Sequence, residues 1–259
     1  MMVMRKPIRE RKADEARLIA RVRPETRREF SRRLRAWFQR HRRDLPWRRT
    51  RDPYEVLVSE LMLQQTQVDR VIGFYDRFLE RFPTLEAVAA APPARVVDAW
   101  DGLGYYARAR NLRALAVLRV AEGSPATLPA DVQALRQLPG IGPYTAGAVS
   151  SFAFERRSPL IDTNVERVLR RVFAPALRPK ASRTHRLLWA LAGALLPPTG
   201  RGTWTHNQAL MELGALVCTA RVAHCERCPV RSLCATGSAT RKATARPEGN
   251  AQPRSVVEY

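Results

Sequence analysis

The sequence has little lysine and no long apolar run. Its four lysines are Lys6, Lys12, Lys180 and Lys242, so arginine supplies nearly all of the positive charge. No segment approaches the roughly 18 unbroken apolar residues of a membrane span, and the charged N-terminus has no apolar core of a secretory signal. We therefore expect a soluble, intracellular protein with no membrane partner.

Cysteine is absent except between residues 218 and 234. The four cysteines are spaced Cys218-x6-Cys225-x2-Cys228-x5-Cys234. In a reducing compartment such a group indicates a metal site rather than disulfides. Zinc is the default for four clustered cysteines, but four thiolates in one short loop can equally hold an iron–sulfur cluster. The spacing leaves both metals open.

Acidic residues are also few relative to basic ones. The chain has 45 Lys and Arg against 24 Asp and Glu, a net charge of +21, with a pI near 11.3. Residues 1–51 hold 19 basic and 6 acidic residues, so 19 − 6 = +13 lies in the first fifth. This excess indicates a polyanionic partner, most often nucleic acid. A solvated tail would explain the N-terminal charge but not the basic remainder.

The apolar pattern predicts helices throughout, with no alternating strand of useful length, so the fold class is all-α. Residues 1–26 have few apolar positions and are expected to form a flexible basic arm. A helix is expected over 27–40, and another begins after Asp52, a good N-cap that precedes Pro53. Residues 236–259 are polar and are expected to be disordered.

Glu60 is the unusual residue of the helix that follows Asp52. Its helical neighbours Val56, Leu57 and Leu63 are apolar, so it shares their face. Partial desolvation there would raise the pKa of the carboxyl group and make it a proton donor near neutral pH. From the residue pattern alone, a surface glutamate at the edge of the apolar stripe is the favoured alternative, because buried unpaired Glu is rare.

The stretch 138–164 contains a glycine turn and a second carboxylate. Gly140 and Gly142 precede Pro143, which suits the first turn of a helix. Free amides at such a helix start favour anions, although an ordinary helix–turn–helix corner is about as well supported by the glycines alone. Asp162 has the position of an N-cap, and this role by itself would explain it.

Two tyrosines follow a second glycine pair. Gly102 and Gly104 precede Tyr105 and Tyr106, and arginines follow. Aromatic residues beside arginines suit insertion into a base stack. Two core tyrosines are the alternative reading.

Taken together, the motifs resemble the helix–hairpin–helix DNA glycosylases of base excision repair, and most closely the adenine glycosylase (MutY-like) branch. Six motifs in order over about 200 residues carry the resemblance: LPWRRTRDPY from Leu45, SELMLQQTQV from Ser59, GLGYYARARNL from Gly102, LPGIGPYTAGAV from Leu138, IDTNVERVL from Ile161 and the cysteine loop.

The resemblance implies two helical modules that flank a DNA-binding cleft. A six-helix barrel with the helix–hairpin–helix would span about 53–160, and a [4Fe–4S] cluster module would combine 27–52 and 161–235. The expected function is that of a monofunctional, monomeric glycosylase, which flips adenine out of a mispair with 8-oxoguanine or guanine and hydrolyses its N-glycosidic bond. One carboxyl group would have a raised pKa and the other a low one.

Residue roles are carried over position by position. Glu60 resembles the catalytic acid, Asp162 the second carboxylate, and Tyr144 and Asn164 the residues that support them. The base-pocket positions are Trp47, Arg48, Leu63, Val68, Gln208 and Met211. The DNA-binding positions are Gln65, Tyr105, Gly140, Gly142 and Thr145. The cluster ligands are Cys218, Cys225, Cys228 and Cys234.

Tyr144 also bears on the reaction type. A related branch cuts the strand through a lysine Schiff base, with its lysine at this position. No lysine lies between Lys12 and Lys180, and arginine stays protonated. The resemblance therefore implies base removal without efficient lyase activity.

The sequence departs from the family pattern in three places. The chain ends soon after the cysteine loop, so we expect it to lack the C-terminal domain that recognises 8-oxoguanine. Thr163 stands where glycine is common and His206 where an aromatic residue is usual, and both are expected to reshape the pocket.

Two alternative functions remain from the sequence. One is a thymine or uracil glycosylase acting opposite guanine, and the other is a catalytically silent DNA-binding protein.

Overall fold

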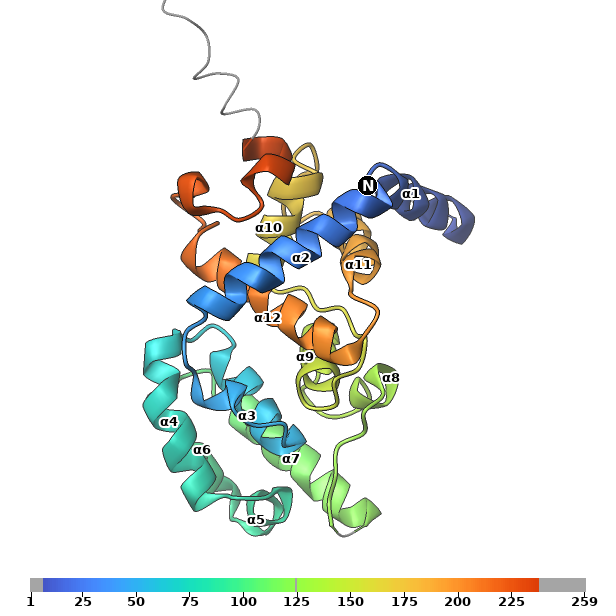
Figure 1. Ribbon diagram of the computed structural model, residues 1–259. Coiled ribbons are helices and arrows are strands. Elements are labelled where there is room, and N and C mark those ends of the chain that lie inside the picture. Colours follow the sequence, from blue (N-terminus) through green and yellow to red (C-terminus); the bar gives the residue numbers. More distant parts are fainter. Residues whose placement is uncertain (1–6, 124, 238–259) are drawn as a thin grey trace, which may run out of the picture.

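The described part of the chain, residues 7–123 and 125–237 of a computed structural model, is built from helices (Figure 1). The α-helices are α1 (Ile8–Ala20), α2 (Pro24–His41), α3 (Pro53–Leu63), α4 (Val68–Arg81), α5 (Leu85–Ala90), α6 (Pro93–Asp98), α7 (Ala107–Glu122), α8 (Val132–Leu135), α9 (Pro143–Phe152), α10 (Thr163–Phe173), α11 (Ser182–Leu195) and α12 (Gly200–Leu216). Short 3₁₀ helices are η1 (Pro46–Arg48), η2 (Cys225–Arg227) and η3 (Arg231–Leu233). The all-α prediction is confirmed.

Side-chain caps fix where the helices near the site begin. Asp52 accepts hydrogen bonds from the backbone N–H groups of Tyr54 and Glu55, and Asp162 accepts one from Val165. Each cap satisfies amides that have no partner within the helix. The predicted starts of α3 and α10 are therefore confirmed.

The helices form two groups (Figure 1). Helices α3 to α7 pack together at one end, and α1, α2, α10, α11 and α12 pack at the other. Helix α9 contacts both α3 and α12, and all of its residues from Thr145 to Phe152 are buried. It is thus the helix that joins the two groups.

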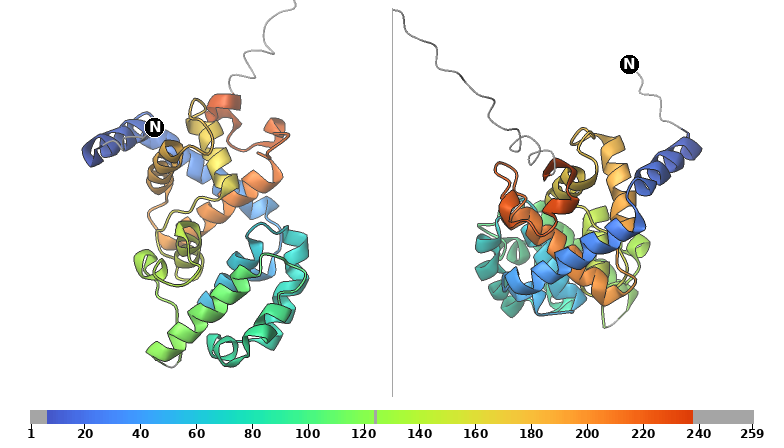
Figure 2. Two further views of the ribbon diagram at one scale, coloured as in Figure 1. Left: turned by 180° about the vertical axis from the view of Figure 1, so that it is seen from behind. Right: turned by 45° about the horizontal axis from the view of Figure 1, so that its top comes forward.

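The expectation that residues 1–26 form an unpacked arm is wrong for the described residues 7–26. Residues 8–20 form helix α1, which lies against α11, while its N-terminal end projects from the body (Figure 2). Leu18 and Val22 are buried in the main core, and Arg186 pairs with Glu15 at 3.0 Å. These contacts, with a second ion pair between Asp14 and Arg183, dock a helix whose own sequence has few apolar residues. Residues 1–6, and 238–259 of the expected tail, lie outside the described residues.

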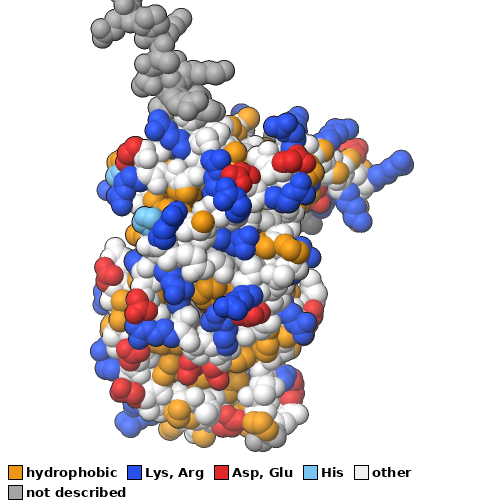
Figure 3. Space-filling view, in the orientation of Figure 1, with side chains coloured by type: hydrophobic (Ala, Val, Ile, Leu, Met, Phe, Trp, Pro, Cys, Tyr) orange, Lys and Arg blue, Asp and Glu red, His pale blue; other side chains and the backbone are white. Residues whose placement is uncertain are grey.

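Arginine and lysine side chains are spread over α1 and α2 on the face shown in Figure 3, with fewer acidic side chains between them. None of the helices in the described ranges is long and apolar enough to span a bilayer.

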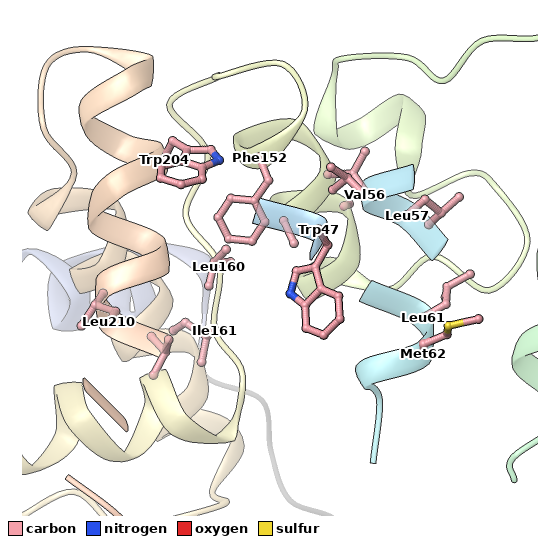
Figure 4. Packing of buried hydrophobic residues seen from close by; sticks show 14 of the residues in the cluster. Trp47, Val56, Leu57, Leu61, Met62, Phe152, Leu160, Ile161, Trp204 and Leu210 are labelled. Atoms are coloured by element: carbon pink, nitrogen blue, oxygen red, sulfur yellow. The ribbon is translucent and has the colours of Figure 1, made fainter. Parts of the chain in front are cut away.

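The core continues through the junction between the groups (Figure 4). Phe152 at the end of α9 and Leu160 beyond it lie between Trp204 on α12 and Val56 on α3. All four side chains are at most 5% exposed. Since burial of a large apolar side chain contributes roughly 1.5–3 kcal/mol, this packing fixes α3, α9 and α12 relative to one another.

Candidate active site

A cavity of about 720 Å³ lies where η1, α3, α9, α10 and α12 meet. The predicted site residues that line it are Trp47, Arg48, Glu60, Leu63, Gln65, Val68, Tyr144, Asp162, Asn164, Gln208 and Met211. The chain thus brings all four expected catalytic residues and all six expected pocket residues into one cavity.

Glu60 is buried in the wall of this cavity, and its residue is 3% exposed. The hydroxyl group of Tyr144 donates a hydrogen bond to Glu60 Oε2 at 2.7 Å. Burial, together with the negative charge of Asp162, raises the pKa of Glu60 to about 7, against the opposing effects of Tyr144 and Arg48. The surface alternative is wrong, and Glu60 can hold a proton near neutral pH.

Asp162 caps α10 and faces the same cavity. Its Oδ1 accepts from the backbone N–H of Val165 at 2.6 Å, and its Oδ2 accepts from Asn164 Nδ2 at 3.0 Å. Burial raises the pKa of Asp162, although these two hydrogen bonds and Arg167 oppose the rise. The expectation of one raised and one low pKa is therefore corrected, because both carboxyl groups are desolvated. The negative charge of Asp162 is one of the causes that raise the pKa of Glu60, so an ionised Asp162 favours the protonated form of Glu60.

Glu212 is a charged residue of the cavity wall that the sequence analysis did not predict. Its side chain is fully buried on α12, where Arg48 and Arg43 each pair with it at 2.8 Å. Burial alone would raise its pKa, but the hydrogen bonds from both arginines lower the pKa to about 2. Arg48 also donates through Nε to Gln208 Oε1 at 2.9 Å. Glu212 thereby fixes the two polar residues of the pocket wall.

The glycine hairpin sets the position of Tyr144. Gly140 and Gly142 are exposed, and Gly140 has a φ of 76°. A β-carbon at Gly140 would lie 2.6 Å from Asn111 Cβ on α7, so only glycine allows this close approach. Thr145 is buried instead of facing solvent, and its hydroxyl accepts from Gln64 Nε2 at 3.3 Å.

Gln65 and Tyr105 come together although they are 40 residues apart. They line a second cavity of about 470 Å³ at the rim of the first. Tyr105 is 58% exposed and does not line the main cavity. Both residues have a positive φ, 57° at Gln65 and 47° at Tyr105. The core alternative for Tyr105 is therefore wrong.

The two departures from the family pattern have different outcomes. Thr163 lines the main cavity. His206 does not, because it is buried against α2, with Nδ1 2.9 Å from Ser31 Oγ. The expectation that His206 reshapes the pocket is wrong. Its neighbour Asn207, which the sequence reading did not assign, donates to Ser151 Oγ and Ser158 O at 2.9 Å each and so ties α12 to the end of α9.

The four cysteines line a separate cavity of about 510 Å³. Arg171 donates to Cys218 Sγ at 3.4 Å, and the backbone N–H of Gly237 donates to Cys234 Sγ at 3.3 Å. Burial and the three other thiols raise the pKa of Cys228, which reaches about 11. Within residues 7–123 and 125–237, no three Cys, His, Asp or Glu side chains form a group that could hold a metal ion.

These features define an all-helical, helix–hairpin–helix protein with two carboxyl groups in one cavity. The family described as HhH-GPD superfamily base excision DNA repair protein matches residues 58–193. The chain belongs to this superfamily.

The curated relatives include longer proteins. Rat adenine DNA glycosylase is 45% identical over 214 residues, which cover 79% of this chain and 41% of that protein. Adenine DNA glycosylase of Mycolicibacterium smegmatis is 48% identical over 198 residues, which cover 76% of this chain and 66% of that protein. The chain spans about two fifths of the length of the mammalian relatives.

Solved structures share the fold along almost their whole length. A thermostable thymine-DNA glycosylase has a TM-score of 0.75 at 31% identity, covering 83% of this chain and 98% of that chain. A trapped covalent endonuclease III–DNA intermediate has a TM-score of 0.67 at 25% identity, covering 82% and 95%. The all-helical architecture is therefore that of a known group of DNA-associated structures.

Proposed function

We propose that the protein is a monofunctional DNA glycosylase that removes adenine mispaired with 8-oxoguanine or guanine. The observation that carries the proposal is the buried Glu60, with a pKa of about 7, in the same cavity as Asp162. The 44–48% identity to adenine DNA glycosylases of rat, human and mycobacteria supports adenine as the base.

Glu60 acts as the general acid. Held protonated by burial and positioned by Tyr144, it gives its proton to a ring nitrogen of the flipped purine. The C–N glycosidic bond then breaks, and the base leaves with the electron pair and the proton. The sugar becomes oxocarbenium-like, and the anionic Asp162 stabilises it. Water adds to the anomeric carbon, and the proton it releases restores the acid.

The cavity wall reads the base. Trp47, Leu63, Val68 and Met211 supply apolar surface, and Arg48 and Gln208 supply donors and acceptors. Because Glu212 holds Arg48 through Nη1 at 3.1 Å and Nη2 at 2.8 Å, the guanidinium is already oriented before a base enters. Preorganised polar groups favour a base that can satisfy them over one that leaves them unpaired.

Duplex DNA binds across the rim of the cavity. Gln65 and Tyr105 act as the wedge that fills the space left by the flipped base. The Gly140–Gly142 hairpin, whose two glycines are exposed, receives a phosphate at the start of α9. We also propose that residues 53–160 form the barrel module, that 27–52 and 161–235 form the second module, and that the protein acts as a monomer on cytoplasmic, nucleoid DNA.

The absence of a suitable lysine supports base removal without strand cleavage. Tyr144 occupies the position at which a lyase would have its lysine, and its hydroxyl bonds Glu60. No lysine is found among the described residues that line the cavity. A tyrosine hydroxyl cannot form a Schiff base with the sugar.

We propose that Cys218, Cys225, Cys228 and Cys234 hold a [4Fe–4S] cluster. In such a cluster each thiolate binds a different iron, so the four sulfurs surround a cavity rather than meet at one point. All four line the 510 Å³ cavity, and Arg171 and Gly237 donate to two of the sulfurs. The cluster would stabilise the loop after α12.

A thymine or uracil glycosylase acting opposite guanine is the second candidate. The thermostable thymine-DNA glycosylase, covered to 98% of its chain, supports this reading. Its 31% identity is lower than that of the adenine glycosylases, so adenine remains the first choice.

A substrate panel separates the candidates. Incubation with A:8-oxoG, A:G, T:G and U:G duplexes, followed by alkali, should reveal abasic sites in the two adenine duplexes. Glu60→Gln should lower the rate by at least about a hundredfold while it spares binding, and Glu55→Gln on the same helix is the matched control. Borohydride should trap little covalent complex. Release of thymine or uracil alone would favour the second candidate, and release of nothing would indicate a silent binder.

A further inference from the structure

A single arginine, Arg108 in the first turn of α7, lies beneath both wedge residues. It is 6% exposed although it carries a charge. Burial lowers its pKa, and its hydrogen-bond acceptors are backbone carbonyl oxygens and one hydroxyl group. A buried guanidinium is costly unless its N–H groups find partners, so this arrangement is built around those partners.

The guanidinium joins two segments that are distant in sequence. Towards the first wedge, Nη1 lies 2.6 Å from the carbonyl oxygen of Gln64 and 3.3 Å from Thr66 Oγ1. Towards the second wedge, Nη2 lies 2.8 Å from Gly104 O, and Nε lies 3.3 Å from Tyr105 O. The residues on both sides of Gln65, and the residues at and before Tyr105, are therefore held by one side chain.

Both wedge residues need such support because their backbones are strained. Gln65 and Tyr105 have φ values of 57° and 47°, in the left-handed region that side chains with a β-carbon disfavour. Such conformations persist only where the surroundings hold them. Without the carbonyl contacts, either loop would relax to a negative φ and turn its side chain away from the cavity rim.

The same guanidinium holds the helix of the catalytic acid. Nη1 lies 2.8 Å from the carbonyl oxygens of Leu61 and Met62, directly after Glu60 at the end of α3. These carbonyls lie in the last turn of α3, where few backbone donors remain and a positive charge is favourable; Leu61 O also accepts from the backbone N–H of Gln64 at 3.4 Å. Arg108 Cζ also lies 5.6 Å from the centroid of the Tyr105 ring.

We infer that Arg108 is the positioning residue that sets both wedge side chains against each other at the end of the helix that carries Glu60, so that base extrusion depends on this one support. The inference rests on the proposed function for the roles of the wedge and of Glu60. Lysine cannot replace Arg108, because an ammonium group has three donors on one atom whereas the guanidinium has five in a fixed plane.

Arg108→Lys in the full-length protein tests the inference in single-turnover assays. On an A:G duplex, the rate of adenine release should fall by at least about tenfold, because a small misplacement of positioned groups is costly. On a single strand, where no extrusion is needed, it should fall by less than about threefold. Fluorescence of 2-aminopurine at the target site of a duplex should show less extrusion than with the unsubstituted protein.

Arg113→Lys is the matched control. Arg113 lies on the same helix and donates to Ala91 O at 2.9 Å, away from both wedges, so its duplex-to-single-strand ratio should not change. Thr66→Val removes one hydrogen-bond partner of Arg108 and should show a smaller decrease in rate, confined to duplex DNA; it serves as the test if Arg108→Lys does not fold.

Equal decreases on duplex and single strand, or no decrease on either, would overturn the inference. If the unsubstituted protein released no adenine, the proposed function would fail instead, and the 2-aminopurine signal would still decide whether Arg108 controls extrusion.

Discussion

The carboxyl group of Glu60 should set the upper pH limit of activity. Its pKa is about 7, and in the proposed mechanism the protonated form is the active one, so the single-turnover rate should not be limited by Glu60 well below pH 7. Above pH 7 it should fall by about tenfold per pH unit. The proposed mechanism also needs an ionised Asp162. Because the pKa of Asp162 is raised, the rate should fall on the acidic side at a pH above the usual pKa range of aspartate.

Tyr144→Phe tests in which direction the alkaline limb of the pH–rate profile moves when Glu60 loses a hydrogen bond. The Tyr144 hydroxyl lowers the pKa of Glu60, so its removal should move the alkaline limb to higher pH. Tyr106→Phe is the control, since its hydroxyl bonds Asp101 outside the cavity. An alkaline limb that stays in place in Tyr144→Phe, or moves to lower pH, would show that Glu60 is not the titrating group.

At the scale of single residues, the sequence indicated which side chains would meet in one cavity better than it indicated the contacts that hold them there. Glu60 shared a face with apolar residues, yet its burial depends on α9 and α10, which lie about 80 to 100 residues further along the chain. Glu212 is the single charged residue between positions 202 and 216, which is a visible signal. Its partners Arg43 and Arg48 are 169 and 164 residues away, and no local pattern specifies such pairs.

At the scale of elements, the helix starts could be predicted from their N-caps, but the packing of helix α1 could not be predicted. Asp52 and Asp162 marked helix starts because capping is local chemistry. Helix α1 was missed because it packs against α11, where Asp14 pairs with Arg183 at 3.3 Å, and because Leu18 is buried in the core. Tertiary contacts of this kind override a low apolar content.

The cysteine loop is the element with the clearest test. It contains short 3₁₀ helices, and Arg171 on α10 donates to Thr219 O at 2.7 Å and Ala220 O at 3.2 Å. The proposed cluster predicts about four iron atoms per chain in protein purified without oxygen, with a broad visible absorption band. Cys225→Ala should lose the band and lower the melting temperature.

Glu226→Gln is the control for the cluster prediction, because Glu226 lines the same cavity and is not a proposed ligand. It should keep the iron. If the unsubstituted protein instead held one zinc ion per chain, the cluster proposal would be wrong, and the cysteines would form the zinc site that their spacing also allows.

At the scale of the whole molecule, the charge of +21 predicts DNA binding that weakens steeply with salt. Helix α1 adds to this charge in an ordered way. Two of its three acidic residues, Asp14 and Glu15, face α11, where they pair with Arg183 and Arg186. The third, Glu10, is exposed, but so are Arg9, Lys12 and Arg17, and Arg21 follows directly at the C-cap. The outward face of α1 is therefore basic.

Replacing these four basic residues by glutamine tests whether α1 reaches the DNA. We expect the plot of log affinity against log salt to become shallower by about 0.9 for each phosphate that these side chains neutralise. The melting temperature should not change, because Leu18 and the ion pairs to α11 remain. Four glutamines at exposed positions of α2 and its N-cap, in place of Arg23, Arg28, Arg32 and Arg40, form the matched comparison. If the slope of log affinity against log salt did not change in the α1 variant, the charge of α1 would contribute nothing to DNA binding. The role of α1 would then be to pack against α11.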